Sequence, residues 1–258
     1  MDWIYLSPHL DDVVLSCGGL VWEQTRSGKK VSILSIFAGD PPEGVPLSPY
    51  AEMHHIRWQT GIEAVSIRRE EDRRACAILG AVPDYWTAPD CLYRLLPDGS
   101  YLVLNRDQLF QPYVPEEEPL VNDLTDWLST KIVPGAQVVS PLTLGGHRDH
   151  RIVRVAAERL GIPLWYYADY PYVVEDAPGA SVNQADAMRA EGWECMGQQV
   201  SADGLKAWQQ GVAAYASQIS TFWGSLAEME QALHLYWSKG GGTCLWRCDR
   251  SPFPALGT

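Results

Sequence analysis

The sequence predicts an α/β fold, in which a Rossmann-like, mainly parallel sheet is flanked by helices and followed by a helical C-terminal extension. Two observations lead to this prediction. Short apolar runs typical of buried strands alternate with segments of helical periodicity, a pattern that indicates βαβ units. The chain also has 258 residues, of which 46% are hydrophobic, so it can bury a sizeable core.

The chain begins with a predicted strand that is followed closely by a predicted helix. Residues 4–7 form an apolar run, and residues 11–26 carry apolar side chains at helical spacing up to Gly28, which ends the helix. The pair Gly18-Gly19 interrupts this helix. Because no phosphate-binding glycine motif surrounds the pair, we expect it to allow close packing of the helix against the sheet.

A second strand, a loop, a helix and a third strand follow. The apolar residues 30–38 predict a buried strand, and four prolines within residues 39–49 predict a loop. Residues 58–79 contain a charged and then apolar helical segment, with Gly80 well placed to end it. Residues 81–86 are the third candidate strand.

The second half of the core repeats this alternation. Two further helix and strand pairs are expected, with helices at 123–132 and 149–160 and strands at 137–140 and 164–168.

After about residue 172 the pattern changes to a polar loop and then to helices, expected at residues 205–217 and 226–236. No linker rich in Pro, Gly or Ser separates this part from the core. We therefore expect one domain over residues 1–258, with a core of about 1–172 and an extension of about 173–258.

The charge and hydropathy of the chain exclude several classes of partner. A net charge of −12 and a pI near 4.9 argue against nucleic acid, because phosphate binding requires clustered Lys and Arg. No apolar run approaches the roughly 20 residues that span a bilayer, and no targeting segment is visible, so we expect a cytoplasmic protein. The eleven Trp and twelve Tyr are compatible with a homo-oligomer without requiring one.

Six cysteines are scattered along the chain, and we expect reduced, mostly buried thiols, because disulfide frameworks belong mainly to short secreted domains. Cys244 and Cys248 are close enough in sequence for a zinc knuckle, but two further ligands are missing nearby.

Two clusters of His and Asp each follow a predicted strand. The first is the segment Ser7-Pro8-His9-Leu10-Asp11-Asp12, and the second is Gly145-Gly146-His147-Arg148-Asp149-His150. Binding sites of open α/β sheets lie at the carboxyl ends of the strands, so the two clusters are expected to assemble one metal site.

The residue types in these clusters suit a catalytic metal with three protein ligands. His9 and Asp12 can face one point above the sheet, and His150 can supply the third ligand. Asp11 would then accept a proton from water, and His147 would hold an oxyanion or protonate a leaving amine. Two imidazoles and one carboxylate suit zinc, although ferrous iron or cobalt can occupy such a site.

Three motifs in this order resemble a known family. Pro8–Asp12 is similar to the PHxDD motif of the LmbE/PIG-L family of zinc-dependent de-N-acetylases, and His147–His150 is similar to its HxDH motif. Arg68–Glu71, followed by Leu79-Gly80, resembles the R-x-x-E helix between them. The resemblance extends from residue 4 to about residue 172.

Family members remove acetate from N-acetylglucosamine-type sugars and leave a free amine. The resemblance implies one zinc ion per chain, held by His9, Asp12 and His150. It further implies Asp11 as the general base and His147 as the electrophilic or acid partner.

The resemblance also implies two supporting roles, Arg68 as a substrate-binding residue and Asp149 as the residue that orients His147. The chain departs from the family at three positions, since Leu10 and Arg148 stand where members often have Pro, and Gly145 where some have Tyr. Arg148 could contact an acidic group of the substrate or solvent.

Structural interpretations compete with these roles. Asp11, Asp12 and Asp149 could cap the helices that follow them, since Asp is favoured at helix N-termini. Arg68 begins a charged run up to Arg74 that is typical of a solvated helix face, so Arg68 itself could form only a surface salt bridge.

Three functions stay open at this point. The first is a de-N-acetylase of an amino-sugar small molecule, which could be a thiol-linked sugar, a glycolipid, a nucleotide sugar or a glycosylated natural product. The second is a zinc hydrolase of another amide, and the third is a binding protein without activity.

Overall fold

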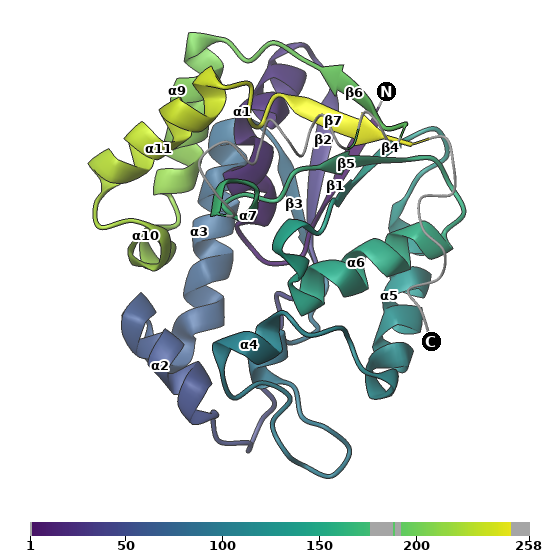
Figure 1. Cartoon of the computed structure of the whole chain (residues 1–258), viewed down its shortest axis with the longest axis vertical. Coiled ribbons are helices and arrows are strands. Elements are labelled where there is room, and N and C mark those ends of the chain that lie inside the picture. Colours follow the sequence, from purple (N-terminus) through teal and green to yellow (C-terminus); the bar gives the residue numbers. More distant parts are fainter. Residues whose placement is uncertain (1, 176–187, 189–191, 249–258) are drawn as a thin grey trace.

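The computed structural model describes residues 2–175, 188 and 192–248. Within them, seven strands form one sheet in the order β3-β2-β1-β4-β5-β7-β6 (Figure 1). The strands are β1 (Asp2–Ser7), β2 (Lys30–Ser35), β3 (Val82–Tyr85), β4 (Gln137–Pro141), β5 (Leu164–Tyr167), β6 (Glu194–Gly197) and β7 (Cys244–Arg247). The helices are α1 (Asp12–Arg26), α2 (Pro49–Trp58), α3 (Ala64–Leu79), α4 (Arg106–Leu109), α5 (Glu118–Lys131), α6 (Arg148–Arg159), α7 (Tyr172–Glu175), α9 (Ala202–Ala213), α10 (Ala216–Phe222) and α11 (Leu226–Ser238), with 3₁₀ turns η1 (Gly61–Glu63), η2 (Cys91–Tyr93), η3 (Pro115–Glu117) and η4 (Leu144–Gly146).

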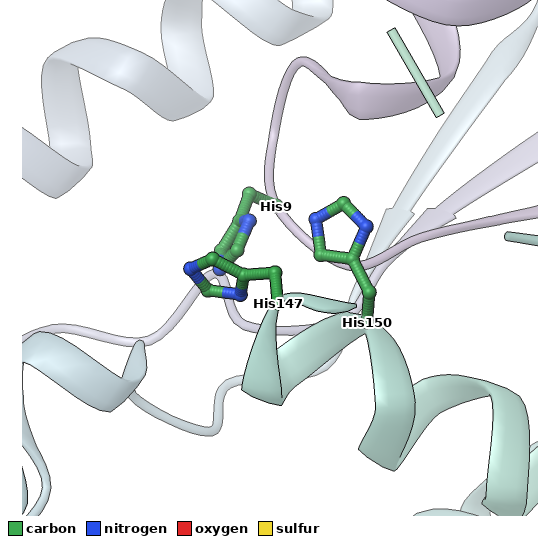
Figure 2. A group of neighbouring side chains, drawn as sticks. All are labelled: His9, His147 and His150. Carbon is green, nitrogen blue, oxygen red and sulfur yellow. The ribbon is translucent and has the colours of Figure 1, made fainter. Parts of the chain in front are cut away.

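The first five strands are parallel, which confirms the predicted mainly parallel sheet. The strand order reverses direction between β1 and β4, because β2 and β3 lie on one side of β1 while β4 and β5 lie on the other. Such a switch point leaves a crevice beyond the carboxyl ends of the two strands. The loop after β1 and the start of α6 meet at this place, and they carry the two His/Asp clusters (Figure 2).

Helices cover both faces of the sheet, and the alternation of side chains along β1 shows why. Trp3 and Tyr5 point into a core formed with α1, α3, α9 and α11, whereas Ile4 and Leu6 point into a core formed with α5 and α6. Successive side chains of a strand point to opposite faces, so a strand covered on both sides is apolar throughout.

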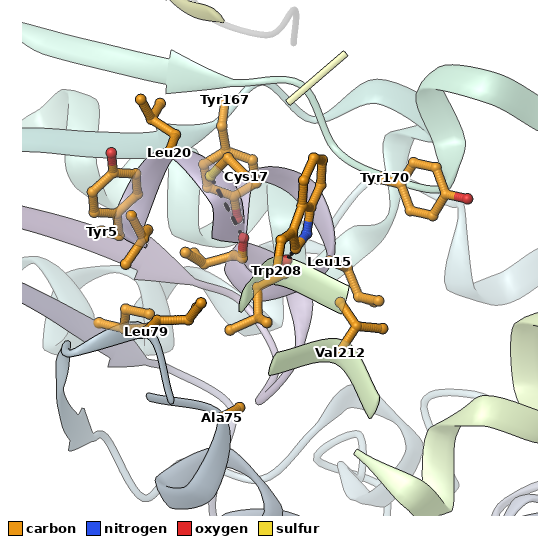
Figure 3. Packing of buried hydrophobic residues seen from close by; sticks show 14 of the residues in the cluster. Tyr5, Leu15, Cys17, Leu20, Ala75, Leu79, Tyr167, Tyr170, Trp208 and Val212 are labelled. Atoms are coloured by element: carbon orange, nitrogen blue, oxygen red, sulfur yellow. Dashed lines mark hydrogen bonds between the residues drawn. The ribbon is translucent and has the colours of Figure 1, made fainter. Parts of the chain in front are cut away.

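The glycine pair in α1 has a packing role, but its partner is a helix and not the expected sheet. A Cβ atom on Gly18 would lie 2.7 Å from the Trp208 ring of α9, and one on Gly19 would lie 2.7 Å from Val200. The Trp208 indole is fully buried and donates a hydrogen bond of 2.6 Å to the Val14 carbonyl (Figure 3). This bond lies beside the break in helical geometry at Cys17.

Most predicted elements are present, although several end at other residues, one is broken in two and others were not expected. The second strand ends at Ser35, three residues earlier than expected, and the helix expected over 205–217 is broken into α9 and α10 around Tyr215. The helix α2 was not predicted at all. Ser48 caps it by accepting a hydrogen bond from the Ala51 main chain, and Pro49 occupies its first turn, which is a combination typical of helix starts.

The C-terminal extension contains the expected helices and also two strands that the sequence analysis missed. β7 pairs antiparallel with β5 and with β6, so the extension completes the sheet. The expectation of reduced thiols is wrong for Cys195 and Cys244, which form a disulfide between β6 and β7. Strand pairing brings their Cα atoms to 5.8 Å, within the range that a disulfide bridges.

The other cysteines in the described residues are free, and Cys17, Cys76 and Cys91 are buried as expected. The division into a core and an extension at about residue 172 stays a prediction. None of the described helices is both long and apolar enough to cross a membrane.

Candidate metal centre and active site

Hydrogen bonds of Ser7 fold the loop that follows β1. The Ser7 hydroxyl donates to the His9 carbonyl at 2.6 Å and accepts the Val13 main-chain N–H at 3.2 Å. The His9 main-chain N–H donates to Asp12 Oδ2 at 2.7 Å, and the same oxygen lies 3.2 Å from His9 Nδ1. The loop thus brings His9 and Asp12 together from one short segment.

The second cluster begins α6, after a turn with positive φ angles at Thr143, Gly145 and Gly146. His147 caps the helix, because its Nδ1 accepts the Asp149 main-chain N–H at 3.3 Å. The interpretation of Asp149 as a cap is therefore wrong. His150, in the first turn, places Nε2 at 3.3 Å from Asp12 Oδ2.

Three imidazoles gather at this point. Figure 2 shows His9, on the loop after β1, facing His147 and His150 at the start of α6, and one ring nitrogen of each lies within 4.8 Å of the others. Asp12 Oδ2 stands close to nitrogens of both His9 and His150. The structure thus brings together the three residues that were expected to hold a metal.

A carboxylate stands behind each of two imidazoles. Asp149 Oδ2 lies 3.1 Å from His9 Nε2, and Asp169 Oδ1 lies 2.6 Å from His150 Nδ1. Metal-binding histidines commonly donate their second ring N–H to a carboxylate, which fixes the tautomer and the ring orientation. In that tautomer, His9 Nδ1 and His150 Nε2 are the nitrogens that would bind a metal next to Asp12.

One buried nitrogen supports a cation at this place. His150 Nε2 lies 3.3 Å from Asp12 Oδ2 but makes no well-aligned hydrogen bond to any described residue. Buried polar atoms are almost always satisfied, so an exception requires an explanation such as a missing ion. Two imidazole nitrogens and one carboxylate oxygen are donors that fit a divalent transition metal.

Asp11 is turned away from this donor set and faces Arg68. It precedes α1, but its side chain makes no capping hydrogen bond, so the capping interpretation of Asp11 is wrong. Arg68 Nη2 lies 3.3 Å from Asp11 Oδ1, and the Arg68 guanidinium stacks over the Trp58 ring at 4.9 Å. Both charged groups are buried, so Arg68 does not form a surface salt bridge.

Burial and neighbouring charges shift the pKa values of these groups in different directions. Burial raises the pKa of Asp11, with Arg68 opposing it, whereas His150 and His9 outweigh burial and lower the pKa of Asp12 well below its usual range. Burial, with His9 and His150 nearby, lowers the pKa of His147 well below its usual range. A neutral His147 whose Nδ1 accepts a hydrogen bond carries its proton on Nε2 and can donate it.

The expectations for Arg148 and Asp149 differ from the structure. The Arg148 side chain is 3% exposed, because α6 packs this face against neighbouring segments. Its Nη1 binds Glu117 Oε2 at 2.7 Å, so Arg148 forms a buried ion pair and not a solvent contact. The Asp149 carboxylate bonds to His9, while only its main-chain N–H contacts the His147 ring.

Several residues near the site were given no role from the sequence. Asp169 is one of them, although it follows β5 at the same sheet edge, and that position was a usable signal. Phe110 directly follows α4 and Tyr172 begins α7, two short helices that the sequence did not predict, and their rings lie edge-on to His147 and His150, with centroids 5.7 Å apart in each pair. The Tyr172 ring fills the space where a Cβ on Gly145 would be.

Comparison with known proteins agrees with this geometry. Residues 4–160 match the family model described as PIG-L, GlcNAc-PI de-N-acetylase. The chain belongs to this family. The family model is described as a de-N-acetylase and the curated relatives are named as deacetylases, so the chain is a hydrolase of a non-peptide amide, and the predicted family is confirmed.

Curated and solved relatives carry related names. A 2'-N-acetylparomamine deacetylase of Niallia circulans is 25% identical over 274 residues, which cover 98% of this chain and 96% of that protein. The zinc-inhibited form of teicoplanin deacetylase Orf2 superposes with a TM-score of 0.77 at 26% identity, covering 97% of this chain and all (100%) of that one. The A40926 pseudoaglycone deacetylase Dbv21 superposes with a TM-score of 0.66 at 26% identity, covering 95% of each chain.

Proposed function

We propose that this PIG-L family member removes the N-acetyl group from an N-acetylglucosamine-type amino sugar that belongs to a larger conjugate. In the reaction, water adds to the acetamide carbonyl, the C–N bond breaks, and acetate and a free amine are released. The observation that carries this proposal is the position of Asp12 Oδ2, within 3.3 Å of nitrogens of both His9 and His150, while Asp11 stands beside it with a different partner.

We assign the metal to His9, Asp12 and His150, with one zinc ion per chain. Support comes from the orphaned His150 Nε2 and from the carboxylates behind both imidazoles. A bound divalent metal supplies a Lewis acid that acidifies water and polarises the acetamide carbonyl. Ferrous iron and cobalt are the other metals that this donor set suits.

The remaining polar residues handle protons and charge. Asp11 takes the proton from the attacking water and passes it toward the departing nitrogen, while Arg68 keeps its carboxylate in one orientation. His147 donates from Nε2 to the oxygen that becomes negative as water adds. Asp149 orients His9 through its carboxylate and supports His147 through its main-chain N–H.

Two aromatic side chains suggest where the sugar lies. Phe110 and Tyr172 are half-buried, stand edge-on to each other at 5.9 Å, and flank His147 and His150. Aromatic side chains offer flat apolar surfaces that suit the apolar face of a sugar ring. Because the relatives are named as deacetylases of 2'-N-acetylparomamine, teicoplanin and the A40926 pseudoaglycone, a glycosylated natural product is the first candidate among the conjugates.

The test removes the metal with a chelator and restores zinc, ferrous iron or cobalt one at a time. Each form is incubated with N-acetylglucosamine, a thiol-linked sugar, a glycolipid, a nucleotide sugar and an N-acetylated aminoglycoside, and free amine and acetate are both measured. We expect equal amounts of the two products from at least one sugar and only in the metal-loaded protein. Activity confined to an N-acetyl peptide would favour another amide hydrolase, and no turnover at full metal occupancy would favour a binding protein.

Two further expectations stay predictions, the cytoplasmic location and self-association into a homo-oligomer. Stable disulfides are rare in the cytoplasm. Free thiols are therefore counted in protein purified from its own cells, and reduced Cys195 and Cys244 would favour a cytoplasmic location. Light scattering during gel filtration gives the oligomeric state.

A further inference from the structure

A chain of buried charges leads away from His9 into the loops beside the site. We refer to Arg148, Glu117, Arg94 and Asp149 as the charge chain. Arg148 Nη1 binds Glu117 Oε2 at 2.7 Å, Glu117 Oε1 accepts from Arg94 Nη2 at 2.9 Å, and the same Arg94 nitrogen binds Asp149 Oδ1. Asp149 Oδ2 then contacts His9 Nε2.

Every member of the charge chain is buried, with exposures of 8% for Arg94, 6% for Glu117, 3% for Arg148 and 0% for Asp149. Burying an ion is expensive unless it is paired and its remaining atoms are hydrogen-bonded. Each charge is paired, because the signs alternate along the charge chain. Main-chain groups bind some of the remaining polar atoms, since Glu117 Oε2 also accepts from the Val114 N–H and Arg94 Nη1 donates to the Pro89 carbonyl.

The charge chain joins segments that are far apart in the sequence. Arg94 follows η2, Glu117 ends η3, and Asp149 lies in the first turn of α6. The Cys91 main-chain N–H of η2 also donates to Asp149 Oδ2 at 3.0 Å, so two groups besides His9 hold this carboxylate. The direction in which His9 presents Nδ1 to Asp12 therefore depends on these distant loops, and Asp90 at the start of η2 also lies 3.5 Å from His9 Nε2.

We propose that Arg94 and Glu117 are positioning residues for the metal centre: Arg94 fixes the Asp149 carboxylate against His9, and Glu117 fixes Arg94. The inference rests on the proposed function only in taking His9 as a metal ligand. Groups behind a metal-binding histidine typically change metal affinity by about 10–100-fold when removed. Arg94 acts one step farther away than Asp149, and Glu117 two steps farther.

The test uses full-length protein loaded with cobalt(II), whose visible absorption reports ligand geometry. The cobalt dissociation constant is measured by chelator competition for the wild type and for Arg94→Met, Arg94→Lys and Glu117→Gln, alongside the thermal midpoint. The matched control is Arg154→Met, because Arg154 is also a buried α6 arginine but bonds to Glu158 and the Leu142 carbonyl, outside the charge chain.

We expect Arg94→Met to weaken cobalt binding by about 10-fold or more and to change the visible spectrum, with partial rescue in Arg94→Lys. Glu117→Gln should give the same change of spectrum with a smaller, few-fold loss. Arg154→Met should lower the thermal midpoint while leaving both cobalt readouts unchanged. If Arg94→Met does not fold, Arg94→Lys and Glu117→Gln carry the test alone.

Wild-type cobalt affinity and spectrum in the folded Arg94 and Glu117 variants would overturn the inference. Equal losses in Arg154→Met would also overturn it, since the effect would then be general destabilisation. A wild-type protein that binds no cobalt would instead refute the proposed metal centre itself, so the two failures can be distinguished.

Discussion

Arg68 and Asp11 form a buried ion pair, with 3.3 Å between Nη2 and Oδ1, directly beside the Asp12 carboxylate that faces the His9 and His150 imidazoles. Two neighbouring aspartates therefore have different partners. Asp12 contacts His9 and His150, whereas Asp11 contacts an arginine from α3, 57 positions later in the chain. A base held by a buried arginine keeps one orientation, and small displacements of a catalytic group are costly.

Replacing Arg68 should therefore reduce the rate without removing the metal. We expect Arg68→Met to lower kcat by about 10–100-fold at unchanged metal content, because the Asp11 carboxylate loses its fixed partner. Arg69→Met is the matched control, since Arg69 binds Asp40 and the Ala38 carbonyl on another side of α3. Equal kcat values for the two variants would contradict the role given to Arg68.

Asp169 should matter for metal retention. In Asp169→Asn, the carboxylate behind His150 Nδ1 is replaced by an amide, and we expect the zinc dissociation constant to rise by about 10–100-fold. Chelator competition measures this change. Asp84→Asn, which removes an ion pair with Lys131 far from the His/Asp clusters, serves as the control and should retain wild-type zinc affinity.

The buried Asp72 predicts how stability depends on pH. Burial raises its pKa to about 7, although hydrogen bonds from the Tyr215 and Tyr85 hydroxyls oppose the shift. Because the pKa of Asp72 is higher in the folded state than in the unfolded state, the protonated carboxyl favours the folded state. This contribution to the free energy of unfolding is fully present below about pH 4 and is lost as the pH rises through about 7.

The corresponding variant is Asp72→Asn, which cannot titrate. We expect the free energy of unfolding of the variant, relative to wild type, to increase by roughly 2–4 kcal/mol between pH 4 and pH 8. Urea unfolding at several pH values measures it, with the exposed Asp126→Asn as a control. A difference between Asp72→Asn and wild type that does not change with pH would refute the prediction.

Trp208 should hold the C-terminal extension against α1. Its fully buried ring lies over Gly18 and Gly19 and donates to the Val14 carbonyl. Removal of such a ring leaves a cavity and an unpaired carbonyl, so Trp208→Ala should cost about 3–5 kcal/mol of unfolding free energy. Denaturant titration tests this, with the half-buried Trp237→Ala as the comparison, for which a smaller loss is expected.

The sequence could predict the sheet and the meeting of the two His/Asp clusters because both are encoded locally. The apolar runs of β1 and β4 are buried on both faces, and the His/Asp clusters come in the loop after β1 and at the start of the helix after β4. Asp169 could have been placed by the same argument, since β5 lies next to β4.

Other features depend on contacts that no local pattern records. Arg94 and Glu117 reach the site from loops without periodicity, and only the folded chain brings them within hydrogen-bond distance of each other. The strands β6 and β7 are short and pair across 49 positions, so neither they nor the Cys195–Cys244 disulfide could be read from spacing. The pattern of a charged helix does not reveal which of its arginines turns inward, so the sequence alone cannot distinguish a buried Arg68 from an exposed one.

The most direct test compares Asp11→Asn with Asp12→Asn, measuring metal content and amine release in the same preparations. The proposed roles predict that Asp11→Asn retains its metal but loses about 10²–10⁴-fold in rate, the usual contribution of a general base. They predict that Asp12→Asn loses both metal and activity. Near wild-type turnover by metal-loaded Asp11→Asn, or full metal occupancy in Asp12→Asn, would contradict this division between the two aspartates.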